Sequence, residues 1–452
     1  MGSITATNSK TYPLETEQRE PVELRVTGTF PPLLAGTLYR NGPGTHRVDS
    51  KTGSYARSHW FDGYALMEKA RRTGDLKEVT FGQKRDPCES FFQKMKTVLV
   101  PTDSVSDPQM VNSNVTVFAN MPGMLKHGPT GPASSHFKVL TCLTDANQIT
   151  QANPETLEPI AASTQQDLHP DLKGQLYCAH PQFDHRTGDV YNYNLHLGPR
   201  STYRIYHTSA HTSRTEVIAT FSIKAAYIHS FFMTEDYIIF CVWPAYFKGL
   251  GTSILWERNM LDAMKFDPTA QSHWFVSTSM DTLHRTYYED LLPPNGEASN
   301  FTLRRSETPM TVRYRLPRLP KESTTRTVVT AERVFGFESG ELPTINPRFA
   351  TKRARYHYCI VNRGHTSFFD GIGKVDLETQ TIQYWGSDTA PHTSSESIFI
   401  PDGTGDAEDA GYLLSVVLNG ETGASYLVCL DARTLTEVGR AEHDHAISFG
   451  LH

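Results

Sequence analysis

The feature that most constrains the fold of this chain is a short turn motif that recurs along it. The motif reads acid or Asn, one or two residues, then Thr before a β-rich run, as in Asn153-Pro-Glu-Thr, Asp184-His-Arg-Thr, Asp376-Leu-Glu-Thr and Asp431-Ala-Arg-Thr. In such a turn the Asp or Asn side chain bonds the backbone two residues further on. The repeat therefore predicts similar hairpins at several places in the chain.

The segments that flank these turns are typical of strands. They are short, rich in Val, Ile, Tyr and Leu, and include KVLTCLTDA, DVYNYNL, YIIFCVW, RYHYCIVN, GYLLSVVL and SYLVCLDA. Helical patterning is confined to windows around Glu89 to Met95, Thr252 to Met264 and Asp281 to Leu292. Over 452 residues this pattern favours an all-β propeller with long insertions, and a chain of two sandwiches is the alternative.

Charge and cysteine content exclude several functional classes. The net charge of -6 comes from interspersed acids and bases without a basic stripe, so we expect no nucleic-acid partner. The six cysteines lie far apart and form no CxxC pair, which predicts reduced thiols in a cytoplasmic protein. No run reaches the roughly 18 apolar residues of a spanning helix, although peripheral contact with a membrane stays open.

The polar N-terminus carries no apolar segment of the kind found in secretory signals. We expect residues 1–20 to form a flexible N-terminal segment. Residues 21–452 are then expected to form a single domain.

Three histidines stand at the ends of strand-like runs in apolar surroundings: His180 in LYCAHPQFD, His229 in AYIHSFFMTEDY and His452 in ISFGLH. Neutral imidazole is a suitable ligand for iron. Their separations of 49 and 223 residues match no local metal motif such as HExxH. Spacing alone therefore does not define a site, and each histidine taken singly is more often a core or surface residue.

Longer blocks of sequence resemble the carotenoid cleavage oxygenase family. LAGTLYRNGPGTHR followed by HWFDGYAL resembles its N-terminal signature, and AHPQFDHRTGDVYNYN, YIHSFFMTEDYIIF and FGLH resemble the segments that carry its first, second and last iron-binding histidines. The resemblance implies a seven-bladed β-propeller with helical and loop insertions on one face. It also implies a non-haem iron(II) dioxygenase, which cleaves a conjugated double bond of a carotenoid or apocarotenoid to carbonyl products.

Position by position, the resemblance makes His180, His229 and His452 the catalytic iron ligands. The family places acids behind its histidines, where a carboxylate accepts the second ring N–H and fixes the tautomer. The matching positions, in TDANQITQANPETLEPI, GELPTINP and SSESIFIPDG, hold Asp145, Glu341 and Glu396.

Asp145 stands where the family has Glu behind the second histidine. Its side chain is shorter by one methylene, or roughly 1.5 Å. A bond from Asp145 to His229 therefore requires a shifted strand or a bridging water.

The family's third histidine lies in a Phe-His-x-x-Asn-Ala-Tyr-Glu segment, which has no counterpart here. HWFV at 273–276 runs straight into STSMDTLHRTYYEDLL, and neither His273 nor His284 has the expected context. We therefore predict that the third ligand is absent and that a second, smaller piece is missing after HWFDGYAL. Glu341, which should stand behind the absent histidine, is expected to be a buried acid with a raised pKa.

Several functions remain open within and beyond this family. LYRNGPG and SILWERNMLDAMKFDP look closest to fungal members that cleave torulene or other long carotenoids, and cleavage of stilbenes is a second possibility. The expected partners are dioxygen and a lipophilic polyene. A hypothesis of a different class is a catalytically impaired propeller that binds a polyene or a protein partner, since one ligand is missing and another is the terminal residue.

Overall fold

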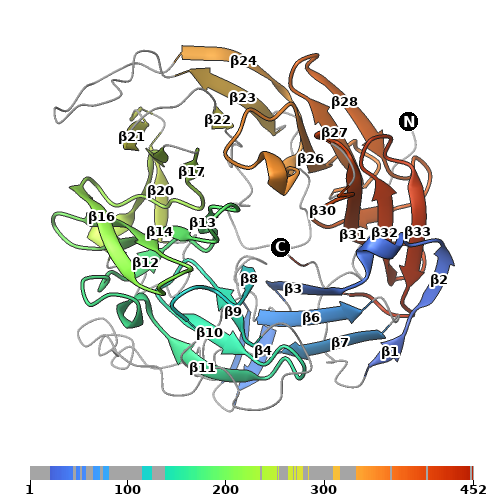
Figure 1. Cartoon of the computed structure of the whole chain (residues 1–452), viewed down its shortest axis with the longest axis horizontal. Helices are drawn as coiled ribbons and strands as arrows, with labels where there is room; N and C mark the ends of the chain where they lie inside the picture. Colours follow the sequence, from blue (N-terminus) through green and yellow to red (C-terminus); the bar gives the residue numbers. More distant parts are fainter. Residues whose placement is uncertain are drawn as a thin grey trace.

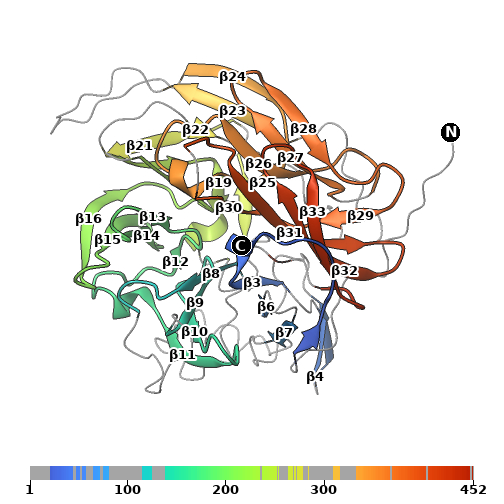
Figure 2. The same ribbon diagram turned by 45° about the vertical axis from the view of Figure 1, so that its right-hand side comes forward.

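The strands of the chain form a ring of antiparallel sheets around a central axis (Figure 1). The computed structural model describes residues 21–43, 47–50, 53–56, 65–71, 75–80, 115–124, 138–234, 237–251, 253, 263–267, 269–270, 272–277, 283–284, 309–315, 332–366, 369–403, 406–447 and 450. The sheets follow one another around the ring in chain order, as the turned view in Figure 2 also shows. The predicted all-β propeller architecture is confirmed.

Four sheets contain a run of four or five consecutive strands. The first contains β8 (Thr116–Ala119), β9 (Leu140–Leu143), β10 (Ile149–Ala152) and β11 (Pro159–Ser163). The second contains β12 (Leu176–Tyr177), β13 (Gln182–Phe183), β14 (Val190–His196), β15 (Thr202–Thr208) and β16 (Thr215–Ser222). The third contains β25 (Glu341–Thr344), β26 (Tyr356–Val361), β27 (Gly371–Asp376) and β28 (Thr381–Trp385). The fourth contains β29 (His392–Ser394), β30 (Ile398–Pro401), β31 (Gly411–Asn419), β32 (Ala424–Asp431) and β33 (Glu437–Glu442).

The other sheets are smaller or draw strands from separate parts of the chain. One has the order β1-β7-β6-β3, from β1 (Val22–Glu23), β3 (Thr37–Pro43), β6 (Ala65–Arg71) and β7 (Asp75–Thr80). Two have three strands: β17 (Phe232–Met233), β18 (Ile238–Val242) and β21 (His273–Ser277), then β22 (Leu283–His284), β23 (Met310–Arg315) and β24 (Glu332–Glu338). Two are ribbons: β4 (Arg47–Ser50) with β5 (Gly53–Ala56), and β19 (Ala245–Phe247) with β20 (Met264–Phe266).

Four complete blades of consecutive strands are therefore present among the described residues, against the seven blades that the resemblance implies. The ring closes through β2 (Arg25–Gly28), which pairs with β33 and so joins the beginning of the chain to its last sheet. Short 3-10 helices occur at η1 (Pro32–Leu34), η5 (Gln165–Asp167), η6 (Lys248–Gly251) and η7 (Pro347–Phe349). No helix of the described residues is long and apolar enough to cross a membrane.

The structure describes few residues of the predicted helical windows: in 252–264, Ser253 is helical, whereas Met264 begins the strand β20. The window 89–95 lies outside the described residues, as does most of 252–264 and 281–292. Within the last window, β22 is a strand, because Leu283 and His284 pair with Tyr314 and Arg313 of β23. Pairing with a neighbouring strand here outweighs the local helical pattern. The predicted flexible segment 1–20 also lies outside the described residues.

The recurring turn motif has the predicted geometry at all four places. A side-chain oxygen accepts the backbone N–H two residues on, at 2.7 to 2.9 Å, in the turns that begin at Asn153, Asp184, Asp376 and Asp431. The residue after the Thr has a left-handed backbone in each case: Leu157, Gly188, Gln380 and Leu435. A fifth turn of this type begins at Asn419 and joins β31 to β32. The motif thus closes at least one hairpin in each of the four blades.

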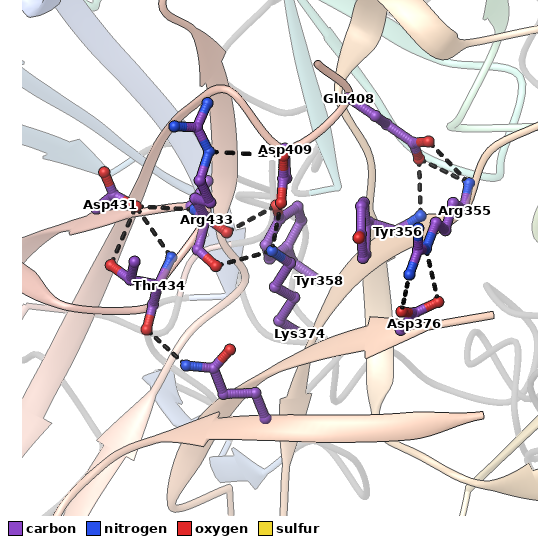
Figure 3. A network of polar contacts seen from close by, with 12 residues as sticks. Arg355, Tyr356, Tyr358, Lys374, Asp376, Glu408, Asp409, Asp431, Arg433 and Thr434 are labelled. Atoms are coloured by element: carbon purple, nitrogen blue, oxygen red, sulfur yellow. Dashed lines mark hydrogen bonds and ion pairs between the residues drawn. The ribbon is translucent and has the colours of Figure 1, made fainter. Parts of the chain in front are cut away.

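A network of charged residues joins the sheet β25–β28 to the sheet β29–β33 (Figure 3). Arg355 forms a two-pronged ion pair with Asp376, with N···O distances of 3.0 and 2.7 Å. Its backbone N–H donates to Glu408, on the connection between β30 and β31. Lys374 is buried and pairs with Asp409 at 2.7 Å. These contacts fix two consecutive blades against each other.

Candidate metal-binding site

His180 and His229 come from the connections of two successive sheets and lie side by side. His180 stands between β12 and β13, and His229 stands between β16 and β17. Their ring centroids are 4.4 Å apart, with an angle of 68° between the ring planes. The structure therefore brings together two of the three histidines that the sequence singles out.

A buried thiol ties the two histidine segments together. The Sγ of Cys178 donates to the carbonyl oxygen of His229 at 2.8 Å, and it accepts the backbone N–H of His180 at 3.2 Å. Burial raises the pKa of the Cys178 thiol well above its usual value, which keeps the thiol protonated and able to donate. The backbones that carry both imidazoles are thus held by one side chain.

Buried tyrosines hold the segment that precedes His229. The hydroxyl of Tyr193 donates to the carbonyl oxygen of Ile228 at 3.0 Å, and the hydroxyl of Tyr203 accepts the backbone N–H of Ala226 at 2.9 Å. Both rings belong to an aromatic cluster whose rings meet edge-on with Phe240. This packing fixes the direction in which the His229 segment enters the site.

On both imidazoles a hydroxyl lies at Nδ1. The Oγ1 of Thr116 is 3.2 Å from Nδ1 of His180, and the hydroxyl of Tyr227 is 2.7 Å from Nδ1 of His229. These contacts make Nε2 the nitrogen of each ring that a metal would bind, and Nε2 of His180 is buried. Neutral imidazole nitrogens are a donor type that metal sites commonly use.

Asp145 lies behind His229 but does not reach its ring. The Oδ2 of Asp145 is 3.7 Å from Nδ1 of His229, whereas the hydroxyl of Tyr227 donates to the same Oδ2 at 2.9 Å. The shorter acid thus meets the histidine through a tyrosine. The sequence predicted that this contact needs a strand shift or a bridging water, and the bridging group is instead Tyr227.

Glu341 is a buried acid at the start of β25, where the chain is tightly constrained. A side chain at Gly340 would collide with the carbonyl oxygen of Ile360, and Leu342 has a φ of 48°, which is unusual for a residue with a branched side chain. The pairing of β25 with β26 shifts register at this point. Burial raises the pKa of Glu341 to about 7. This agrees with the expectation of a buried acid whose pKa is raised.

Glu396 lies between β29 and β30 and is also buried. The preceding residue, Ser395, accepts a hydrogen bond from the guanidinium of Arg40 at 3.2 Å. A side chain at Gly450 would collide with the same guanidinium, so the end of the chain returns close to Glu396. His452 itself lies outside the described residues, and its role as a ligand stays a prediction.

His273 and His284 were the nearest substitutes for the third ligand of the family. His273 begins β21 and pairs with Val242, and His284 ends β22. Within the described part of the chain, no group of three or more His, Cys, Asp or Glu residues could hold a metal ion, but His452 does not belong to that part. The described donors of the candidate site are therefore His180 and His229.

Sequence reasoning missed three residues of this site: Thr116, Cys178 and Tyr227. Tyr227 stands two residues before His229, and in extended chain such residues share a face, so a local signal for it exists in the sequence. Cys178 also lies two residues before its histidine, His180. Thr116 is 64 residues from His180, and no local pattern indicates their contact.

Comparisons with known proteins agree with this architecture. The family model described as retinal pigment epithelial membrane protein (RPE65) matches residues 11–284 and 276–452. A carotenoid dioxygenase of Neurospora crassa is 34% identical over 97% of this chain and 89% of its own length. A torulene dioxygenase of Fusarium fujikuroi is 33% identical over 100% of this chain and 94% of its own length.

Solved structures share the fold at low sequence identity. Cobalt-substituted apocarotenoid oxygenase of Synechocystis has a TM-score of 0.73 and 20% identity, over 99% of this chain and 97% of its own. A variant of the same oxygenase has a TM-score of 0.72 over 100% of this chain and 99% of its own, also at 20% identity. The matches to the family model and to the fungal relatives cover nearly the whole chain, and it therefore belongs to the RPE65 or carotenoid oxygenase family, as the sequence blocks implied.

Proposed function

We propose that this chain is an iron(II) dioxygenase that cleaves a conjugated double bond of a carotenoid or apocarotenoid to two carbonyl products. The family and the dioxygenase names of the fungal relatives support the reaction class. The observation that carries the proposal is the contact between His180 and His229, whose rings converge from two sheets at 4.4 Å. We further propose that the bound metal is iron, that the protein is cytoplasmic, and that it contacts a membrane peripherally.

His180, His229 and His452 would hold the metal through neutral imidazole nitrogens. Bound iron(II) would supply the activation of dioxygen, while the protein supplies placement and a shaped site. When all metal ligands are histidines, the acids do not bind the metal but lie behind its ligands. This differs from sites in which two histidines and one carboxylate bind the metal. Asp145 fits this role, because its charge reaches His229 through a hydroxyl rather than by coordination.

Metal content and cleavage, measured together, test the proposal. We expect His180→Ala and His229→Ala each to lose iron after anaerobic reconstitution and to lose cleavage of torulene or an apocarotenal, followed by chromatography of the carbonyl products. His185→Ala is the matched control, because His185 is exposed in the turn between β13 and β14. Wild-type protein that neither retains iron nor consumes any polyene would contradict the proposal.

A second candidate function is an impaired propeller that binds a polyene without cleaving it. The family model matches in two segments that meet at 276–284, where the sequence lacks the context of the third histidine. The alignment with the Neurospora relative spans 550 positions, whereas this chain has 452 residues. Quenching of tryptophan fluorescence by an added polyene that is recovered intact would favour this function over cleavage.

A further inference from the structure

We propose that Tyr227 is a positioning residue of the metal site, whose hydroxyl connects the carboxylate of Asp145 to the imidazole of His229. This inference rests on the proposed function, because it assigns the orientation of one proposed ligand. The tyrosine supplies the reach that the short side chain of Asp145 lacks. It belongs to neither the predicted ligands nor the predicted acids.

Distances exclude a direct bond and support the connected one. The Oδ2 of Asp145 is 3.7 Å from Nδ1 of His229, and an N–H···O bond to a carboxylate is about 2.7–2.9 Å long. The two contacts through the hydroxyl of Tyr227 are 2.9 Å to Asp145 and 2.7 Å to His229. Both fall within hydrogen-bonding distance. The connection is thus complete through the tyrosine and incomplete without it.

The direction of these bonds fixes the tautomer of His229. A carboxylate can only accept, so the single proton of the Tyr227 hydroxyl is donated to Asp145. The hydroxyl oxygen must then accept from His229, which places the imidazole proton on Nδ1. Nε2 is left with its lone pair, and this is the form that binds a metal.

Both partners of His229 are held in place by the backbone around them. The N–H of Tyr227 donates to the carbonyl oxygen of Ala245 at 2.9 Å, and the indole N–H of Trp243 donates to the carbonyl oxygen of Tyr227 at 2.6 Å. The Oδ1 of Asp145 accepts the N–H of Ala179 at 3.1 Å. The side chain of Asp145 is 10% exposed, so water screens the connection only weakly. The hydrogen-bonded connection from Asp145 through Tyr227 to His229, here called the relay, is therefore held in place without a metal ion.

Cobalt binding tests the relay without relying on catalysis. We would titrate the full chain with Co²⁺ and follow the visible absorption of the bound ion. Loss of an outer partner of a ligand typically weakens metal binding roughly 10- to 100-fold, so we expect Tyr227→Phe to weaken Co²⁺ binding by about that factor. Tyr358→Phe is the matched control, since it removes a buried hydroxyl that donates to the carbonyl oxygen of Ala432 and contacts no residue of the candidate site. A roughly 10- to 100-fold loss is expected only for a group that contacts a ligand. The control hydroxyl contacts none, so we expect less than about 3-fold change in its Co²⁺ affinity.

A compensating substitution separates positioning from general damage. In the double variant Tyr227→Phe with Asp145→Glu, the added methylene extends the carboxylate by roughly 1.5 Å, enough to reach Nδ1 of His229 directly. We expect this variant to regain most of the lost affinity. Failure of the rescue, with affinity as low as in Tyr227→Phe alone, would overturn the proposed relay.

Nitrogen NMR of labelled histidine gives a readout that needs no metal. We expect His229 in the metal-free wild type to carry its proton on Nδ1, and this preference to weaken in Tyr227→Phe. An Nε2-protonated His229 in the wild type, or unchanged tautomer and affinity in Tyr227→Phe, would refute the inference. If the wild type binds no Co²⁺ but the tautomer shifts as expected, the proposed function fails while the positioning role of Tyr227 stands.

Discussion

Two joins between successive sheets gather buried and half-buried polar residues, and they differ in how completely the charges are matched. At the join of β25–β28 with β29–β33, Arg355 pairs with Asp376 and Lys374 pairs with Asp409 (Figure 3). At the join of β12–β16 with β17, β18 and β21, the polar groups are two imidazoles with hydroxyls at Nδ1. Matched opposite charges define the first join, whereas two adjacent imidazoles with hydroxyl partners define the second.

Two acids of the blade β25–β28 differ in the same respect, because one has a cation beside it and, among the described residues, the other does not. The Arg355 guanidinium beside Asp376 holds the pKa of that carboxyl well below its usual range. Glu341, on β25 of the same blade, has its pKa raised to about 7 by burial alone, with no cation among the described residues to offset it. A charge matched in the fold favours ionisation, whereas a desolvated acid without a cation favours the neutral form. An acid of the second kind is consistent with the prediction that the partner histidine of Glu341 is absent.

Breaking the matched join should have the largest effect. Lys374→Ala removes the cation from Asp409, whose side chain is only 15% exposed, and leaves the more distant Arg433 at 3.8 Å. Removing one partner of a buried ion pair costs about 3–5 kcal/mol, so we expect a loss of about 3 kcal/mol in the free energy of unfolding. Urea denaturation measures it, with the exposed Lys352→Ala as control. A loss below about 1 kcal/mol, the range of surface pairs, would show that the network adds little.

Completing the site should have the next largest effect. We expect insertion of a segment with Phe-His-x-x-Asn-Ala-Tyr-Glu after Val276, near the end of β21, to give Glu341 an imidazole partner and the metal a further ligand. Because outer partners alone change metal affinity roughly 10- to 100-fold, we expect a rise of at least about 100-fold. Iron titration and polyene cleavage measure the gain. Equal affinity and activity with and without the insertion would show that three histidines suffice.

The fold could be predicted from local chemistry because its hairpins repeat. The turns at Asn153 and Asp431 depend on one side chain and the backbone two residues away, so a short window of sequence contains the whole interaction. The strand at Leu283 could not be predicted in this way, since its partner in β23 lies about thirty residues further along the chain. The turn at Asn419 has the same local chemistry and could have been found.

The candidate site could be predicted only in part, for the same reason. Family resemblance indicated His180 and His229, and the short side chain of Asp145 indicated that something must bridge it. Which group does so depends on how the segment of Tyr227 packs against Asp145, 82 residues earlier in the chain. No spacing pattern in the sequence indicates this contact. The contact between Thr116 and His180 joins residues that are 64 positions apart, and it too depends on how the sheets fold.

Removing the charge of Glu341 should have the smallest effect. The pH dependence of the free energy of unfolding, together with metal content, distinguishes a desolvated acid from a metal ligand. The pKa of Glu341 is about 7 in the folded chain and 4.5 in the unfolded reference, so between these values the folded protein binds more protons. The stabilising contribution of the protonated Glu341 side chain is therefore fully present below pH 4.5 and is lost as the pH rises through 7. Glu341→Gln keeps the shape without the charge, and we expect it to raise the free energy of unfolding by about 2 kcal/mol at pH 8 and not at all near pH 4.5. Metal content should stay unchanged, with Glu216→Gln on the exposed face of β16 as control. If iron affinity falls clearly instead, Glu341 binds the metal, and the site works with three histidines and one carboxylate.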